Sequence, residues 1–82
     1  MMPNRKEVER LRAMMPKGIR VKLIYMSDDP RPIPDGTLGT VDHVDDVGDV
    51  HTKWDNGRYL AFIPSVDIYE IIGSSDPLKK SL

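Results

Sequence analysis

Alternating hydrophobic and polar residues predict five short β-strands along the chain. Over residues 19–26, every second side chain is apolar or aromatic, which is the pattern of a strand with one buried face. The side chains expected on that face are Ile19, Val21, Leu23 and Tyr25. The other strands are predicted over residues 36–44, 49–54, 58–63 and 68–72. Short consecutive strands joined by tight turns indicate an antiparallel meander that curls into a small barrel.

A helical pattern precedes the strands. Asn4 is a favourable N-cap and Glu7 completes a capping box, so a helix is expected to begin at Arg5. Apolar residues then recur at the spacing of one helical face, and they are Val8, Leu11, Met14 and Met15. Pro16 and Gly18 are expected to end the helix. Because so short a helix is marginal alone, we expect it to dock on the barrel or on a partner.

Proline and glycine mark the connections between the strands. Three prolines within residues 27–35 exclude a central strand, so this segment is predicted to be a long, stiff loop. Gly36 and Gly39 are expected to be structural, because Gly39 interrupts the alternation where a bulge or sharp bend would turn a barrel corner. Asn56 and Gly57 predict a two-residue type I′ hairpin turn.

Charge is distributed unevenly along a chain whose net charge is −1. Residues 1–23 contain seven Lys and Arg against two Glu, and residues 24–50 contain seven Asp against one Arg. A basic helix laid over an acidic loop would neutralise both. The absence of cysteine excludes a disulfide framework, a thiolate zinc site and a cysteine nucleophile. Neither a signal peptide nor a membrane-spanning segment is recognisable, so a cytoplasmic protein without membrane contact is expected.

Three stretches of the sequence carry a resemblance to a known family. They are NRKEVERLRAMMPKGIRV, PDGTLGTVDHVDDVG and WDNGRYLAFIP. Over residues 4–72 the chain resembles domain-of-unknown-function family 4314, which consists of short bacterial and phage proteins. The Gly-Thr-Val and Trp-Asp-Asn-Gly elements are also similar to those of SH3-like modules. The resemblance implies an SH3-like fold and a setting in phages and mobile elements, and it assigns no catalytic residue and no activity.

The expected fold is therefore mainly β, a small five-stranded SH3-like barrel with a short N-terminal α-helix. Residues 1–17 are predicted to form the amphipathic helix that packs on the barrel. Residues 18–72 are predicted to form the barrel itself. Residues 73–82 have the composition of a flexible C-terminal tail.

The residues that could carry chemistry indicate binding rather than catalysis. No carboxylate pair and no arrangement of Ser, His and Asp has the spacing of a catalytic motif, so no enzyme activity and no cofactor is expected. Acidic and imidazole side chains crowd the second hairpin, and they are Asp42, His43, Asp45, Asp46, Asp49 and His51. Their spacing matches neither a calcium loop nor a zinc motif, so no metal is expected and the aspartates are predicted to cap the turn.

Three binding functions remain open. The first is a noncatalytic SH3-like module that acts through protein contacts, either with another protein or in a homo-oligomer, as an accessory protein of a phage or mobile element. The second is nucleic-acid binding through the basic helix and the first strand. The third is a sponge that captures a small anionic, nucleotide-like ligand between protomers.

The candidate binding residues come from the basic helix, the first strand, and the third and fourth strands with the turn between them. They are Arg10, Arg12, Lys22, Tyr25, His51, Lys53, Trp54, Arg58 and Tyr59. Trp54 has two interpretations. An exposed indole before a turn would be a stacking platform, and an inward indole would fill the core of a small barrel.

Overall fold

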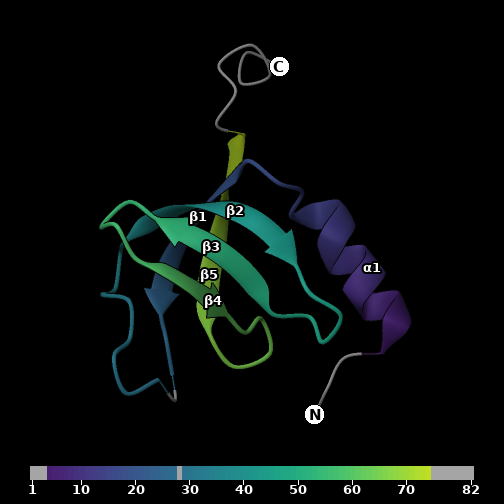
Figure 1. The fold of residues 1–82 in the computed structure, drawn as a ribbon, viewed down its shortest axis with the longest axis horizontal. Coiled ribbons are helices and arrows are strands. Elements are labelled where there is room, and N and C mark those ends of the chain that lie inside the picture. The colour runs from purple at the N-terminus through teal and green to yellow at the C-terminus, as the bar shows by residue number, and fades with distance from the viewer. Residues whose placement is uncertain (1–3, 28, 75–82) are drawn as a thin grey trace.

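The computed structural model describes residues 4–27 and 29–74, which form one helix and a five-stranded antiparallel sheet (Figure 1). The elements are α1 (Arg5–Met14), β1 (Ile19–Tyr25), β2 (Leu38–Val44), β3 (Val50–Trp54), β4 (Tyr59–Phe62) and β5 (Ile68–Ser74). Their order in the sheet is β4-β3-β2-β1-β5. The predicted mainly β domain with five strands and a short N-terminal helix is confirmed, whereas its assignment to the SH3-like class stays a prediction.

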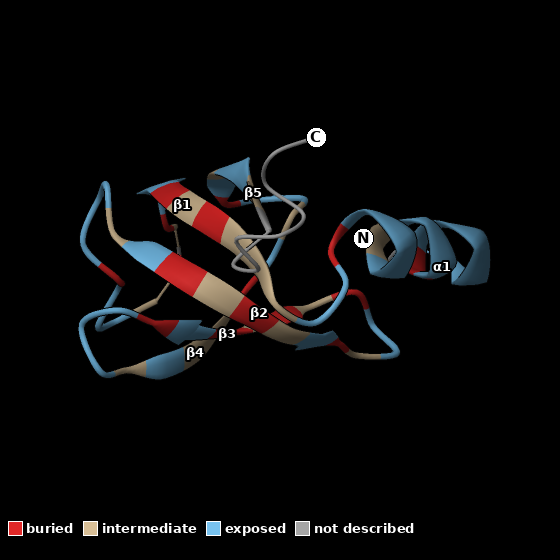
Figure 2. Cartoon of the chain, turned by 90° about the horizontal axis from the view of Figure 1, so that it is seen from above, coloured by how far each residue is buried: buried red, intermediate tan, exposed pale blue. Residues whose placement is uncertain are grey.

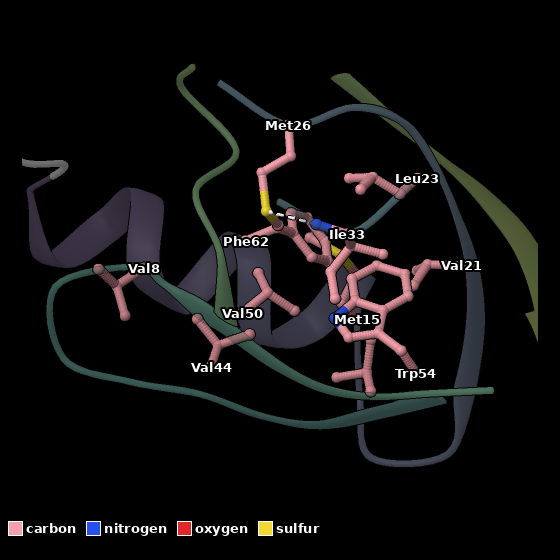
Figure 3. Packing of buried hydrophobic residues seen from close by; sticks show 11 residues of the cluster. Val8, Met15, Val21, Leu23, Met26, Ile33, Val44, Val50, Trp54 and Phe62 are labelled. Carbon is pink, nitrogen blue, oxygen red and sulfur yellow. Dashed lines mark hydrogen bonds between the residues drawn. The ribbon is translucent and has the colours of Figure 1, made fainter. Parts of the chain in front are cut away.

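The sheet curls around a single core. Buried positions alternate along β2 and β3, as Figure 2 shows. The curl brings the two ends of the strand order together, because the ring centroids of Phe62 on β4 and Tyr69 on β5 lie 4.7 Å apart. Trp54 packs beside Phe62, with ring centroids 6.1 Å apart (Figure 3). Its indole N–H donates to the carbonyl oxygen of Leu60 at 3.0 Å. Aromatic and aliphatic side chains together fill the interior of the curled sheet.

The proline-rich loop between β1 and β2 is fastened to the core and to the β4–β5 connection. Ile33 in this loop is buried, and its backbone N–H points at Sδ of Met26 at 3.5 Å (Figure 3). Asp67, which precedes β5, is also buried. Its carboxylate accepts the backbone N–H of Ile63 at 2.7 Å and that of Ser27 at 2.9 Å. This one side chain therefore joins the end of β1 to the turn before β5.

Tyr25 does not share the buried face of β1, which corrects the sequence prediction. The pairing of β1 with β5 shifts between Leu23 and Tyr25 and leaves Ile24 as an extra residue. A bulge of this kind turns the next side chain to the opposite face. Val21 and Leu23 are buried, whereas Tyr25 is 52% exposed and Met26 takes the next buried position.

Gly39 is required for packing and does not form the predicted bulge. It pairs in register with Val21 on β1 and with Trp54 on β3. The irregularity of β2 falls instead between Val41 and His43. A Cβ atom on Gly39 would lie 2.6 Å from Cε3 of Trp54, far inside van der Waals contact. The indole therefore lies against a backbone that has no room for a side chain.

The turn at Asn56 and Gly57 is a three-residue loop, so the prediction of a type I′ turn is wrong. The N–H of Gly57 donates to the carbonyl of Trp54 at 3.0 Å, and the N–H of Trp54 donates to the carbonyl of Arg58 at 2.8 Å. Oδ1 of Asn56 accepts the N–H of Arg58 at 3.0 Å. Gly57, with a φ of +92°, occupies the left-handed position that this loop type requires. The turn over residues 45–49 repeats the same backbone bonds.

The helix docks on its own sheet. Figure 1 places α1 beside the end of β2. Val8 and Met15 are buried. Arg12 donates from Nε to the carbonyl of Val44 at 3.1 Å, and its Nη2 lies 2.7 Å from Oδ1 of Asp46. An apolar stripe and one arginine therefore hold α1 against β2 and the β2–β3 turn.

The last strand extends further than the sequence predicted. Gly73 and Ser74 still pair with Arg20 and Ile19 of β1. The boundary drawn at residue 72 therefore falls inside β5. The rest of the predicted tail, residues 75–82, lies outside the described residues.

Candidate binding surfaces

Three basic residues of α1, β1 and the segment between them form ion pairs with nearby carboxylates. Besides the contact of Arg12 with the β2–β3 turn, Nζ of Lys17 lies 3.6 Å from Oδ1 of Asp42. Arg20 makes two hydrogen bonds to the carboxylate of Asp55, at 2.8 and 2.6 Å. The charge asymmetry of the sequence is thus partly cancelled in space. This pairing weakens the basic footprint that a nucleic-acid interface needs.

A polar cluster lies on the outer face of the sheet, and its members are Asp42, His43, Asp45, His51 and Tyr59. His43 and His51 are cross-strand partners whose rings stack, with centroids 4.4 Å apart and planes inclined by 7°. Nδ1 of His43 lies 2.7 Å from Oδ2 of Asp42. Nε2 of His51 lies 2.8 Å from Oδ2 of Asp45. Each imidazole is therefore held by a carboxylate of its own.

Hydrogen bonds stabilise the ionised form of both carboxylates in this polar cluster. Those from His43 and from the hydroxyl of Tyr59, which lies 2.9 Å away, lower the pKa of Asp42. The same contact with Asp42 raises the pKa of Tyr59. Burial would raise the pKa of Asp45, but hydrogen bonds from His51 and from two backbone N–H groups lower it below its ordinary value. Carboxylates of low pKa are weak bases and a phenol of high pKa is a weak nucleophile.

A shallow groove borders the polar cluster where α1 and the following turn meet β2. Its lining residues are Arg12, Met15, Pro16, Lys17, Asp42, His43 and Val44. Arg12 and Lys17 line the groove together with the imidazole of His43 and three apolar residues, Met15, Pro16 and Val44. One carboxylate, that of Asp42, also faces the groove. The lining combines positive charge with an aromatic ring, which suits a small anion that carries a ring of its own.

An apolar surface, defined by Tyr25, Val66 and Ile68, covers the corner where β1 meets β5. Tyr25 and Ile68 are cross-strand partners, and they are 52% and 56% exposed. Val66 is also exposed, and its carbonyl accepts the hydroxyl of Ser27 at 3.2 Å, which places it beside the end of β1. Further along β5, Ile72 is 52% exposed. Contiguous exposed apolar residues of this kind are typical of protein contacts.

The structure brings some of the predicted binding residues together on one face, and it buries one of them in the core. His51, Lys53 and Tyr59 share the outer face of β3 and β4, where Lys53 and Tyr59 are cross-strand partners. Tyr25 lies on β1, which β3 and β2 separate from β4 in the sheet order. Trp54 is 1% exposed, so its interpretation as a core residue is correct and it leaves the candidate surface.

The remaining candidates are basic and lie apart from one another. Arg10 is exposed on α1. Lys22 is the cross-strand partner of Glu70. Arg58 donates from Nη1 to the carbonyl of Pro32 at 3.3 Å, and this bond ties the β3–β4 turn to the proline-rich loop. These three residues form no continuous basic face.

Sequence reasoning missed Val66 and Ile68 as surface residues. Ile68 starts a predicted strand whose period-2 pattern allowed either face to be buried. Only its pairing with Tyr25 after the β1 bulge shows that both face outward. One signal in the sequence could have indicated an exposed apolar residue on this strand. Ile68, Ile71 and Ile72 cannot all lie on one face of so short a strand, so at least one of them has to face outward.

Metal and membrane signals are absent from the part of the chain that the structure describes. Within residues 4–27 and 29–74, no group of three or more His, Asp or Glu is placed to hold a metal ion. None of the helices described there is long and apolar enough to cross a membrane.

Comparison with known proteins confirms the predicted family resemblance. The model of a family described as Domain of unknown function (DUF4314) matches residues 4–72. No curated protein and no solved structure matches the chain.

Proposed function

We propose that this chain, which belongs to the DUF4314 family, is a noncatalytic cytoplasmic binding module that acts through protein contacts at the apolar surface. The observation that carries the proposal is the exposed cross-strand pair Tyr25 and Ile68, flanked by Val66. Aromatic side chains are enriched at protein interfaces. An accessory role in a phage or mobile element is part of the proposal and rests on the family resemblance.

The polar cluster supports a noncatalytic role. Asp42 is hydrogen-bonded to His43, and Asp45 is hydrogen-bonded to His51. The hydroxyl of Tyr59 donates a hydrogen bond to Asp42. A general base needs a pKa near the working pH, and the pKa values of these carboxylates are shifted the other way. The cluster is therefore suited to holding β2, β3 and β4 together.

Affinity capture with matched surface variants tests the proposal. The chain is immobilised and exposed to a lysate of the cells that express its gene. A protein partner should be retained by the wild type and by Tyr59→Phe, which changes the polar cluster, and lost with Ile68→Lys. Retention of the same partner by Ile68→Lys would refute the proposed surface. Tryptophan fluorescence checks that each variant keeps Trp54 buried.

A second function is favoured by the groove between α1 and β2, which could capture a small anionic ligand. Arg12 and Lys17 supply positive charge, and the exposed imidazole of His43 supplies a ring face for stacking. Lys17 is the better probe of this function, because Arg12 also holds α1 to the sheet. No comparable grouping of cations around a groove favours nucleic-acid binding in the described residues, and that function stays a prediction.

Thermal unfolding in the presence of nucleotides tests ligand capture. A ligand that binds the native state raises the melting temperature. The increase should disappear in Lys17→Glu and persist in Lys53→Glu, which reverses a charge on β3 at a residue that does not line the groove. A nucleotide pool that leaves the melting temperature unchanged would refute this second function.

A further inference from the structure

The outer edge of β5 is the longest unpaired strand edge of the sheet. Among the described residues, β5 pairs with β1 on one side and with no strand on the other. The opposite edge of the sheet, β4, has only four residues, whereas β5 has seven. Natural edge strands are usually protected by shortness, by proline or by charge. Residues 68–74 contain no proline and one charged side chain, that of Glu70.

We infer that β5 pairs antiparallel with β5 of a second copy of this chain, so that two sheets join across a two-fold axis at Glu70. This inference rests on the proposed function, because it names the partner of the apolar surface. The register sets Ile68 of one copy opposite Ile72 of the other, and the contact occurs twice by symmetry. Both isoleucines are more than half exposed in the single chain.

Charge and side-chain pattern select a second copy over a charged partner. Glu70 is the cross-strand partner of Lys22, so one acidic and one basic residue lie side by side on this part of the surface and favour neither a basic nor an acidic partner. The net charge of the whole chain is only −1, which keeps the repulsion between two copies small. The alternate residues 68, 70 and 72 are Ile, Glu and Ile, and this order is the same in either direction along the strand. An antiparallel copy therefore meets an identical apolar pattern.

The shape of β5 limits the length of the contact. A shift in the pairing with β1 leaves Ile72 as an extra residue, so regular geometry ends there. The joined segment therefore covers residues 68–72. Tyr25, beside Ile68 on β1, then extends the apolar contact on the same face. The two Glu70 side chains meet at the axis, and like charges placed directly opposite weaken strand pairing.

Sedimentation of the full chain over a wide range of concentration tests the inference. The wild type should form a reversible dimer. Ile68→Lys should weaken the dimer at least about tenfold in Kd, because it puts an unpaired charge in the contact. Glu70→Gln should tighten it by removing the central repulsion. A wild type that stays monomeric, or a dimer that Ile68→Lys leaves unchanged, would overturn the inference.

Cysteine cross-linking tests the register directly, because the natural chain has no cysteine. Oxidation should link Glu70→Cys chains into covalent dimers, since paired residues at the axis come within disulfide range. Ile68→Cys mixed with Ile72→Cys should also link, whereas Ser65→Cys should not. Linkage of Glu70→Cys no faster than that of Ser65→Cys would exclude this register. A monomeric wild type whose protein partner is nevertheless lost in Ile68→Lys would leave the proposed function standing without the second copy.

Discussion

Replacing Gly39 with alanine should cost far more stability than an ordinary surface substitution. The added Cβ would lie 2.6 Å from Cε3 of Trp54 and 2.8 Å from Cγ2 of Thr52. Carbon atoms in good contact are separated by roughly 3.5 to 4.0 Å, so both contacts overlap by about 1 Å. The indole cannot swing aside easily, because it is buried and bonded to the carbonyl of Leu60. Strands β2 and β3 must therefore move apart.

The expected loss for Gly39→Ala is about 2 to 3 kcal/mol, the usual cost of overpacking a well-filled core. A domain of this length has a total stability of roughly 4 to 12 kcal/mol, so the loss is a large part of the whole. Urea unfolding followed by the fluorescence of Trp54 measures it. With a slope of about 1 kcal/mol per molar urea, the midpoint should fall by about 2 to 3 M.

A second substitution identifies the cause of the loss. Thr52→Ser removes Cγ2 and keeps the hydroxyl that donates to the carbonyl of Val50 at 3.0 Å. If steric overlap is responsible, Thr52→Ser should cost less in the Gly39→Ala background than in the wild type. A loss below about 0.5 kcal/mol for Gly39→Ala would show that the strands absorb a methyl group, and would refute the packing argument.

Three further predictions concern turns and charges. Asp67→Ala should cost about 2 to 4 kcal/mol, since it leaves the N–H groups of Ile63 and Ser27 without their acceptor; an unchanged urea midpoint would contradict this. Gly57→Val should cost more than about 1 kcal/mol, because the φ of +92° is unfavourable for a β-branched residue although the space around it is empty; a variant as stable as the wild type would disprove it. The contact with Arg20 lowers the pKa of Asp55 in the folded state, so the unfolded state binds more protons between the two pKa values and stability should fall as the pH drops below about 4. Asp55→Asn should flatten that fall in a series of urea midpoints measured against pH, and an equally steep fall would show that other carboxylates cause it.

Local patterns predicted most of the secondary structure. The capping residues Asn4 and Glu7 placed the start of α1 correctly, and the N–H of Glu7 does donate to Oδ1 of Asn4 at 2.9 Å. The strand predicted over residues 49–54 contains β3, along which Val50, Thr52 and Trp54 alternate as buried positions. Such signals succeed because a cap or an alternation involves neighbours in sequence, whose geometry the chain sets locally.

The binding surfaces were harder to predict. Both His43 and His51 stood out in the sequence, yet their stacking follows from the register of β2 against β3, which includes a shift after Val41. The apolar surface depends in the same way on the bulge at Ile24, because a one-residue shift reverses the direction of Tyr25. Strand register is decided by contacts distant in sequence, so single-sequence patterns leave it open.

By itself, the sequence determined the helix, the five strands, the proline-rich loop and the positions of the turns, because these depend on local backbone preferences and on the spacing of apolar residues. Tertiary structure decided the roles of the residues that depart from these local patterns. Position 39 has no room for a side chain because the indole of Trp54 lies against its backbone. The side chain of Ile33, although it belongs to the proline-rich loop, is buried in the core. The basic helix shares one of its positive charges with the acidic turn because folding brings Asp46 to Arg12. Each of these outcomes depends on contacts between residues far apart in the chain, which come into being only when the sheet closes around its core.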